Sequence, residues 1–443
     1  MELLQALERF LAENVKGVSV DAQAILAHAI RQPSYDGVSS DRRIEEIGQP
    51  SYCDPVQPPG VPYSLDVRDF EIALDNALQS VVAGYVAQLR QSDQIVFTKV
   101  WQYAKRPPQD GRLRWTPDVK MHVASVSKLM TAMAMTVLLR DKEISPDAQI
   151  INYLPDYWAK GSNIEYIVFR NLFNHTSGLS ANAVVDFDIM KSAIAGGINL
   201  PSPAGGINLG DLGFYNYQNV NYGLFRILLA IINGSVNKDA YFNPTPFADP
   251  AYNDAIWDLV TIGAYEGYLQ EKVFQPSGVT DATLDHPAGC ALAYHRPDDI
   301  NPGWNSGNMQ ERCGCDGWHL SVNDLLNVMG EFRRGNGILN SGDAQAMLDN
   351  GFGVDPLCGN SALPTALPTL AGNVYCKPGD WHENNNPHTR DEQSLAFFLP
   401  QDMELVVFVN STVDGQTGAT NLFRQVVTQA YVGSLVQSTP PHV

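Results

Sequence analysis

The chain has 443 residues and a formal net charge of −19, and so large an acidic excess argues against binding to nucleic acid or to an anionic membrane surface. Hydrophobic residues make up 44% and charged residues 17%, which is typical of a globular protein with a sizeable core. The six cysteines are too sparse for a disulfide framework in a chain of this length. We therefore expect reduced structural thiols or one incidental disulfide.

The sequence predicts neither a membrane span nor a secretion signal. The longest apolar run, residues 225–232, contains Arg226 and is much shorter than the roughly 20 residues that a membrane-spanning helix needs. Glu2 and Glu8 stand where a signal peptide carries basic residues, and no continuous apolar segment follows them. We expect a cytoplasmic protein, or a secreted one if a signal has been removed.

Residues 1–65 are interpreted as an N-terminal helical extension and linker. Apolar residues recur at helical spacing from Leu3 to Leu11, and Ser19 is the expected cap of a second short helix. Prolines at five positions between 47 and 62 indicate a linker. This extension either packs on the main body or forms a separate module.

The remainder, residues 66–440, has strand patterns near both ends and helix patterns between them. The pattern predicts a helix over 70–81, strands over 84–90 and 95–103, a long helix from near Ser125, a strand hairpin over 394–399 and 405–409, and a final helix over 417–432. This order predicts an α+β fold (an α/β sandwich), in which an antiparallel sheet flanked by helices is built from both chain ends. The sheet part would be about 66–145 and 365–440, with a mostly helical part inserted at about 146–364.

The strongest chemical signal is Ala124-Ser125-Val126-Ser127-Lys128, which precedes an apolar helix. A separation of three residues places Ser125 and Lys128 on one helical face, within hydrogen-bonding reach. A neutral lysine can accept the serine proton, and the free N–H groups of a helix N-terminus favour developing negative charge. The alternative is a capping serine followed by an ordinary surface lysine.

Other motifs accompany this pair in a fixed order. They are FRNLFNHTSGLS, YQNVNYGL, GYLQEKVFQPSGVTDATL, GWHLSVNDLLNVM and LAFFLPQDMELVVFVNS. Together with VASVSKLMTAMAMTVLLRDKEISPDAQIINYLP, they resemble the serine β-lactamase and penicillin-binding-protein superfamily across about residues 75–435. The resemblance is to its class C β-lactamase, D-aminopeptidase and family VIII esterase branch, whose β-lactamase/transpeptidase-like fold is therefore expected.

The resemblance implies a role for several residues. Ser125 would be acylated and Lys128 would activate it. Tyr217 of the Tyr217-Gln218-Asn219 motif would be the second acid/base residue, and Asn219 would bridge Lys128 and a substrate amide. His175 would belong to a structural turn and would not form a triad with Ser125.

The third motif of the family is a Lys-Thr-Gly or His-x-Gly strand that lines the pocket. It best matches Lys377-Pro378-Gly379-Asp380-Trp381, whose Asp380 N–H would form an oxyanion hole with that of Ser125. Pro378 replaces the hydroxyl residue that helps to bind a β-lactam carboxylate. Rival matches use His382 or His388, and the choice between them stays open.

We therefore expect a serine hydrolase that acts through an acyl-enzyme on an ester or amide, of the esterase, amidase or D-amino-acid peptidase type. The alternatives are β-lactamase or DD-peptidase activity, acyl transfer, and a non-catalytic binding protein on the same fold. A small-molecule ester, amide or peptide substrate is expected, with no cofactor and no metal. Cys313-Gly314-Cys315 with His319 is a weak metal half-site, because no second cysteine pair follows it. The oligomeric state stays open.

Overall fold

A computed structural model describes residues 2–31, 37–38, 63–181, 185–202, 210–247, 249–298, 300–356, 367–383, 389–413 and 420–437. The chain forms two compact units. The first, called the helical unit, comprises Met1–Tyr35, Met130–Pro276 and Met309–Cys315. The second, called the sheet unit, comprises Asp36–Leu129, Ser277–Asn308 and Asp316–Val443.

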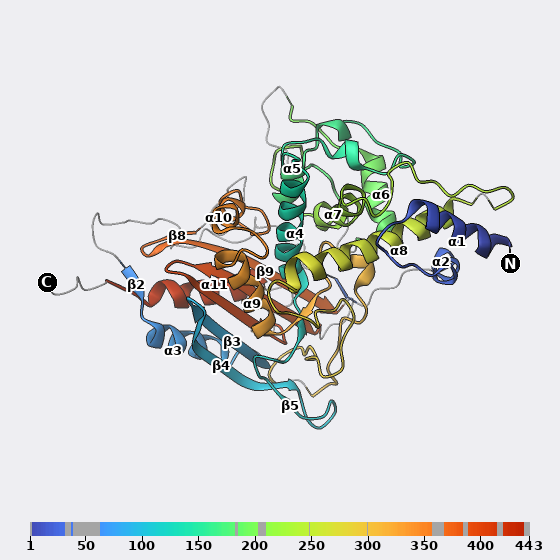
Figure 1. Ribbon diagram of the computed structural model, residues 1–443. Helices are drawn as coiled ribbons and strands as arrows, with labels where there is room; N and C mark the ends of the chain where they lie inside the picture. The colour runs from blue at the N-terminus through green and yellow to red at the C-terminus, as the bar shows by residue number, and fades with distance from the viewer. Residues whose placement is uncertain are drawn as a thin grey trace. The chain divides into compact units, whose positions relative to one another are not determined.

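The sheet unit is built around an antiparallel sheet with the order β1-β9-β10-β11-β3-β4-β5, and β8 pairs with β9 (Figure 1). Strands from the two chain ends meet where β11 pairs with β3, as the sequence predicts. The bounds are β1 (Gly37–Val38), β3 (Gly84–Gln91), β4 (Gln94–Lys105), β5 (Leu113–Arg114), β8 (Leu367–Thr369), β9 (Gly372–Glu383), β10 (Asp391–Leu399) and β11 (Met403–Val409). The predicted α+β fold is thereby confirmed.

Both faces of this sheet are covered by helices. On one face, α3 (Val67–Leu78) and α11 (Thr420–Gly433) bury Phe70 and Phe423 in a cluster that includes Cys376 and Leu395 of the sheet. Phe397 of β10 also belongs to this cluster. Because side chains alternate along a strand, the next residue, Phe398, faces the other side of the sheet and contacts Phe332 of α9 (Val322–Arg334). A capping box between Ser321 and Asp324 begins α9.

A buried ionic cluster joins α9 to the sheet. Glu404 of β11 is fully buried and lies 3.3 Å from Arg90 of β3 and 2.6 Å from Arg334 of α9. Gly330 of α9 lies against Arg90, and a Cβ at that glycine would collide with the guanidinium group. A fully buried carboxylate is tolerated here because cations surround it.

The helical unit includes the first part of the N-terminal extension, Met1–Tyr35. Its helices are α1 (Glu2–Asn14), α2 (Ala22–Ala29), α5 (Phe169–Phe173), α6 (Phe187–Gly196), α7 (Asn219–Ile232) and α8 (Pro250–Leu269), together with most of α4 (Ser127–Asp141). His28 of α2 lies 2.7 Å from Asp258 of α8, and Asp258 also pairs with the buried Arg226 of α7. Helix α2 of the extension therefore packs on the rest of this unit. Asp21 caps α2, so the expected Ser19 cap is wrong.

Shorter elements complete the described chain. They are β2 (Tyr63–Leu65), β6 (Met121–His122), β7 (His319–Leu320), α10 (Ser341–Asp349) and β12 (Leu435–Gln437). The expected linker over 47–62 lies outside the described residues, and the predicted domain limits stay a prediction. Among the residues that the structure describes, no helix is long and apolar enough to cross a membrane. Cys290, Cys313, Cys315 and Cys376 are free thiols, as expected for reduced cysteines.

Candidate active site

The serine and lysine of the first motif lie together in a buried turn. Ser125 belongs to a 3-10 turn over Ala124–Val126, which leads directly into α4. Lys128 is fully buried, and its Nζ lies 2.8 Å from Oγ of Ser125, which is 6% exposed. Ala124 has a φ of +45°, a conformation that is strained for a residue with a side chain and that is typical of functional sites.

Neighbouring strands hold this turn in place. The N–H of Val123 donates to Trp318 O at 2.9 Å, and the hydroxyl of Ser394 on β10 donates to Val123 O at 2.7 Å. The second serine of the motif, Ser127, is fully buried and accepts a hydrogen bond from the N–H of Trp318 at 3.2 Å. Ser127 therefore holds the backbone, whereas the hydroxyl of Ser125 is in contact with Lys128.

Strand β9 lies against the same turn because Gly379 has no side chain. A Cβ at Gly379 would lie 2.4 Å from Val123 O and 3.0 Å from Val126 N, which is too close for either backbone atom. The Lys-Pro-Gly segment that the sequence predicts to be the third motif is thus beside the Ser125 turn. Since side chains alternate along a strand, Lys377 and Gly379 share one face of β9.

Lys377 is almost completely buried and pairs with a carboxylate. Its Nζ lies 2.5 Å from Oδ1 of Asp355, and the side chain is 1% exposed. Burial lowers the pKa of the Lys377 ammonium group, and the Asp355 carboxylate partly offsets this effect. Asp355 is a partner that sequence reasoning missed, because nothing in the sequence around it distinguishes it from other loop aspartates.

The structure also describes Asp380, Trp381 and His382, the other candidates for the third motif on β9. Asp380 is buried, and its Oδ1 lies 3.1 Å from Nδ1 of His382. Trp381 is 1% exposed and meets the ring of His122 edge-on, with ring centroids 5.7 Å apart. His388, the other rival for this motif, lies outside the described residues.

Tyr217 and Asn219 belong to the helical unit, whereas Ser125 and Lys128 belong to the sheet unit. Asn219 is fully buried at the first position of α7, and Tyr217 is partly exposed just before it. The ring of His175 stacks on Tyr217 with centroids 4.3 Å apart, and its Nδ1 lies 3.1 Å from Gln218 O. His175 thus supports the turn that carries Tyr217. The convergence of all four residues in one site stays a prediction.

A family model with the description Beta-lactamase matches residues 72–237. At a TM-score of 0.53 and 16% identity, the structure is similar to a class C β-lactamase from Rhodobacter sphaeroides, with 82% of this chain and 98% of that one covered. Residues 72–237 thus match the Beta-lactamase family, and the structure has the β-lactamase/transpeptidase-like fold that the resemblance predicts.

Two further solved structures and one curated protein are also similar to the chain. A D-amino acid amidase from Ochrobactrum anthropi SV3 gives a TM-score of 0.52 at 17% identity over 82% of this chain and 98% of that one. EstCE1 is described as a hydrolase with promiscuous acyltransferase activity. It gives a TM-score of 0.55 at 15% identity, with 82% of this chain and 99% of that one covered. PbpX of Bacillus subtilis (strain 168), which carries the name of a penicillin-binding protein, is 22% identical over 214 residues, or 47% of this chain. That match spans 43% of PbpX. The family match and these neighbours support a hydrolase.

Proposed function

We propose that the chain is a serine hydrolase that acts through an acyl-enzyme on a small ester, amide or peptide. The observation that carries the proposal is the 2.8 Å contact between Lys128 Nζ and Ser125 Oγ in a buried, strained turn. Removal of an ammonium group from water disfavours its charged form. A neutral Lys128 is suited to take the proton from Ser125.

In the proposed first half-reaction, Oγ of Ser125 attacks the substrate carbonyl carbon as its proton passes to Lys128. The tetrahedral intermediate then collapses, the bond to the alcohol or amine breaks, and that leaving group receives a proton. Water attacks the acyl-enzyme in the second half-reaction, which releases the acid and restores the Ser125 hydroxyl. An alcohol or amine in place of water would make the same site an acyltransferase.

The developing oxyanion requires N–H donors, and β9 offers one. The C=O of Cys376 accepts from the N–H of Asp355 on the outer edge of β9, whereas the N–H of Glu383 donates to Arg390 O across the hairpin with β10. Backbone groups alternate between the two edges of a strand. The N–H of Asp380 therefore points to the outer edge, like the C=O of Cys376. This orientation supports the proposed pairing of Asp380 N–H with the N–H of Ser125 as an oxyanion hole.

Tyr217 and Asn219 are proposed as further residues of the reaction. Their sequence motif resembles that of the family, and the His175 ring that stacks on Tyr217 fixes the turn before α7. Tyr217 would deliver the proton to the leaving group and later activate the water. Asn219 would bind the substrate amide.

The substrate class proposed is an ester, an amide or a D-amino-acid peptide. Similar structures are described as a hydrolase with promiscuous acyltransferase activity and a D-amino acid amidase. A dedicated β-lactamase is a weaker fit, because Pro378 stands where the family's Lys-Thr-Gly motif has a hydroxyl. Turnover measured across short acyl esters, D-amino acid amides and a chromogenic cephalosporin separates these activities.

The test uses Ser125→Ala, with Ser127→Ala as the matched control. Hydrolysis of a p-nitrophenyl ester is expected to fall to the uncatalysed background in Ser125→Ala. Ser127→Ala removes the neighbouring hydroxyl that holds the Trp318 backbone, so turnover falls less and the nucleophile remains. Wild-type turnover by purified Ser125→Ala would exclude the proposed nucleophile. A folded wild-type protein without turnover on any substrate would favour a binding role.

A further inference from the structure

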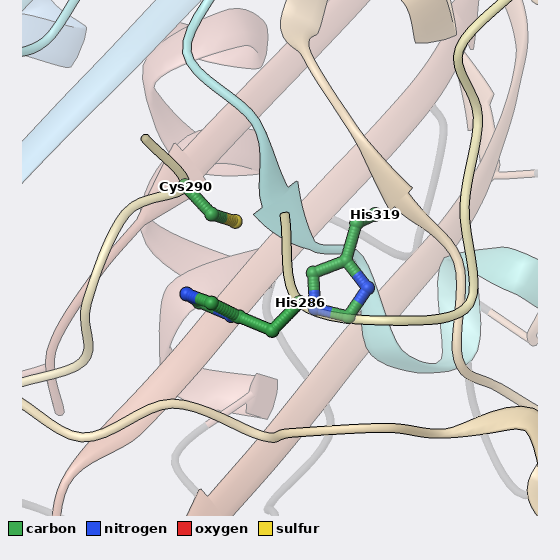
Figure 2. A group of neighbouring side chains, drawn as sticks. All are labelled: His286, Cys290 and His319. Atoms are coloured by element: carbon green, nitrogen blue, oxygen red, sulfur yellow. The ribbon is translucent and has the colours of Figure 1, made fainter. Parts of the chain in front are cut away.

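A second group of reactive side chains lies in the sheet unit, outside the proposed hydrolase site. His286 and Cys290 lie on the loop that follows Leu284, and His319 lies on β7. Donor atoms from these side chains all lie within 4.8 Å of one another. Figure 2 shows the three side chains as one group of neighbours. A bridge between Thr283 and His319 holds the loop to the strand.

Each member offers a donor of the kind that binds transition metals. Nδ1 of His319 donates to Gly317 O at 3.1 Å, which leaves Nε2 with its lone pair, 3.3 Å from Ser306 Oγ. Nδ1 of His286 is buried and has no hydrogen-bond partner among the described residues. The Cys290 thiol donates to Lys120 O at 3.0 Å. A buried imidazole nitrogen without a partner costs free energy, so this nitrogen is suited to a ligand.

Burial determines the charge of these groups. It lowers the pKa of His286 to about 4 and that of His319 well below its usual value, so both imidazoles are in the neutral form that coordinates metals. Burial raises the pKa of the Cys290 thiol. Thiolate formation at Cys290 therefore needs a cation close by.

A buried carboxyl group lies next to the cluster. Glu392 of β10 is fully buried, and Oε2 lies 3.4 Å from Nδ1 of His122. It also interacts with Ser306, the neighbour of His319. Burial raises the pKa of the Glu392 carboxyl group well above its usual value.

We propose that His286, Cys290 and His319 bind a divalent transition-metal ion of the zinc type. Imidazole and thiolate donors select such ions over Mg²⁺ or Ca²⁺, which require oxygen ligands. Tetrahedral zinc with these ligands places its donor atoms roughly 3.3–3.6 Å apart. The donor atoms must therefore close by about 1 Å when the ion binds. A water molecule would take the fourth position.

The bound ion would join the loop to the turn that carries Ser125. β7 pairs with β6, His319 lies opposite His122, and His122 is followed by Val123 and the Ser125 turn. Metal binding would therefore stabilise the segment that precedes the nucleophile. The metal site does not depend on the proposed hydrolase function.

The test adds Co²⁺ to the full-length, metal-free protein. A bound thiolate gives a sulfur-to-cobalt charge-transfer band in the near ultraviolet, and tetrahedral geometry gives intense d–d bands in the visible. The expected result is one Co²⁺ per chain with both signatures, displaced by Zn²⁺. Cys290→Ser is expected to remove the charge-transfer band and to weaken binding at least tenfold.

Cys315→Ser is the matched control, because the Cys315 thiol is also buried and donates to a backbone carbonyl, that of Arg312, at 3.1 Å. It is expected to keep the spectrum and the affinity of the wild type. His286→Gln changes a partly exposed side chain and is expected to weaken Co²⁺ binding tenfold or more. This second variant keeps the test valid if Cys290→Ser does not fold. Co²⁺ binding without a thiolate band, or equal affinity in wild type and His286→Gln, would overturn the proposal. Ser125→Ala is expected to bind Co²⁺ like the wild type, which separates this site from the hydrolase.

Discussion

Gly379→Ala adds one methyl group at the closest approach between β9 and the Ser125 turn. In the present backbone this carbon would lie 2.4 Å from Val123 O, whereas real Cβ atoms essentially never approach closer than 3.0 Å. Strand and turn must therefore separate by roughly 0.6 Å. Of the three nearest atoms, Val123 O and Val126 N belong to the backbone, and the third, Ser394 Oγ at 2.6 Å, donates a hydrogen bond to Val123 O. Movement of a side chain therefore cannot relieve the contact with Val123 O.

Gly379→Ala is expected to lower both the free energy of unfolding and the turnover. Overpacking of a buried contact destabilises a protein by about 1–3 kcal/mol. A displacement of about 1 Å near reacting groups reduces turnover by up to about a hundredfold, so a shift of roughly this size predicts a loss of tenfold to a hundredfold in ester hydrolysis. The assays are urea unfolding followed by circular dichroism, and p-nitrophenyl ester turnover at saturating substrate.

Gly267→Ala is the matched control. Gly267 lies inside α8 and has open space around its would-be Cβ. Alanine is favoured over glycine in a helix interior, so this variant is expected to gain about 0.5–1 kcal/mol. If Gly379→Ala retains both the stability and the turnover of the wild type, the close approach of β9 to the Ser125 turn is wrong.

Three further changes test other parts of the structure. Lys377→Ala is expected to lower ester turnover by about tenfold to a thousandfold, as expected for loss of an electrostatic stabiliser; a greater loss in His382→Ala would place the third motif there instead. Glu404→Gln leaves the buried guanidinium group of Arg90 without its carboxylate and is expected to lower the free energy of unfolding by about 3 kcal/mol, measured with urea. The control Asp147→Asn, in the exposed pair with Arg170, is expected to lower it by about 0–1 kcal/mol. His28→Gln tests a pKa that its hydrogen bond to Asp258 raises in the folded protein. The stabilisation by the His28–Asp258 pair is complete below the unfolded pKa of about 6.5 and is lost as pH rises through the folded pKa. The variant is therefore expected to lose more free energy of unfolding at pH 6 than at pH 9. An equal loss at both pH values would contradict this linkage.

Local patterns in the sequence predict much of the fold. The hairpin around Pro400, Gln401 and Asp402 has a φ of +58° at Gln401 and +60° at Asp402, a conformation that aspartate tolerates better than most residues. The helix predicted over 70–81 begins earlier, at Val67, because the side chain of Asp66 accepts hydrogen bonds from the N–H groups of Arg68 and Asp69. Periodicity finds the helix, but the cap determines where it begins.

The site is predictable only where its residues are close in sequence. The three-residue spacing of Ser125 and Lys128 predicts the contact that the structure contains. By contrast, the Lys377–Asp355 pair depends on how a loop returns to β9. The proposed metal cluster also escapes prediction. The sequence groups His319 with Cys313 and Cys315, whereas the structure groups it with His286 and Cys290, whose four-residue spacing is a weak signal by itself.

The most direct test of the central claim is covalent labelling of the nucleophile. Intact-mass measurement after treatment with a fluorophosphonate is expected to show a single adduct, mapped by peptide sequencing to Ser125. Ser125→Ala is expected to remain unlabelled, and Lys128→Ala is expected to react at least a hundredfold more slowly, since general-base assistance contributes about a hundredfold to ten-thousandfold. A folded wild-type protein that gains no adduct, or an adduct on another serine, would contradict the account.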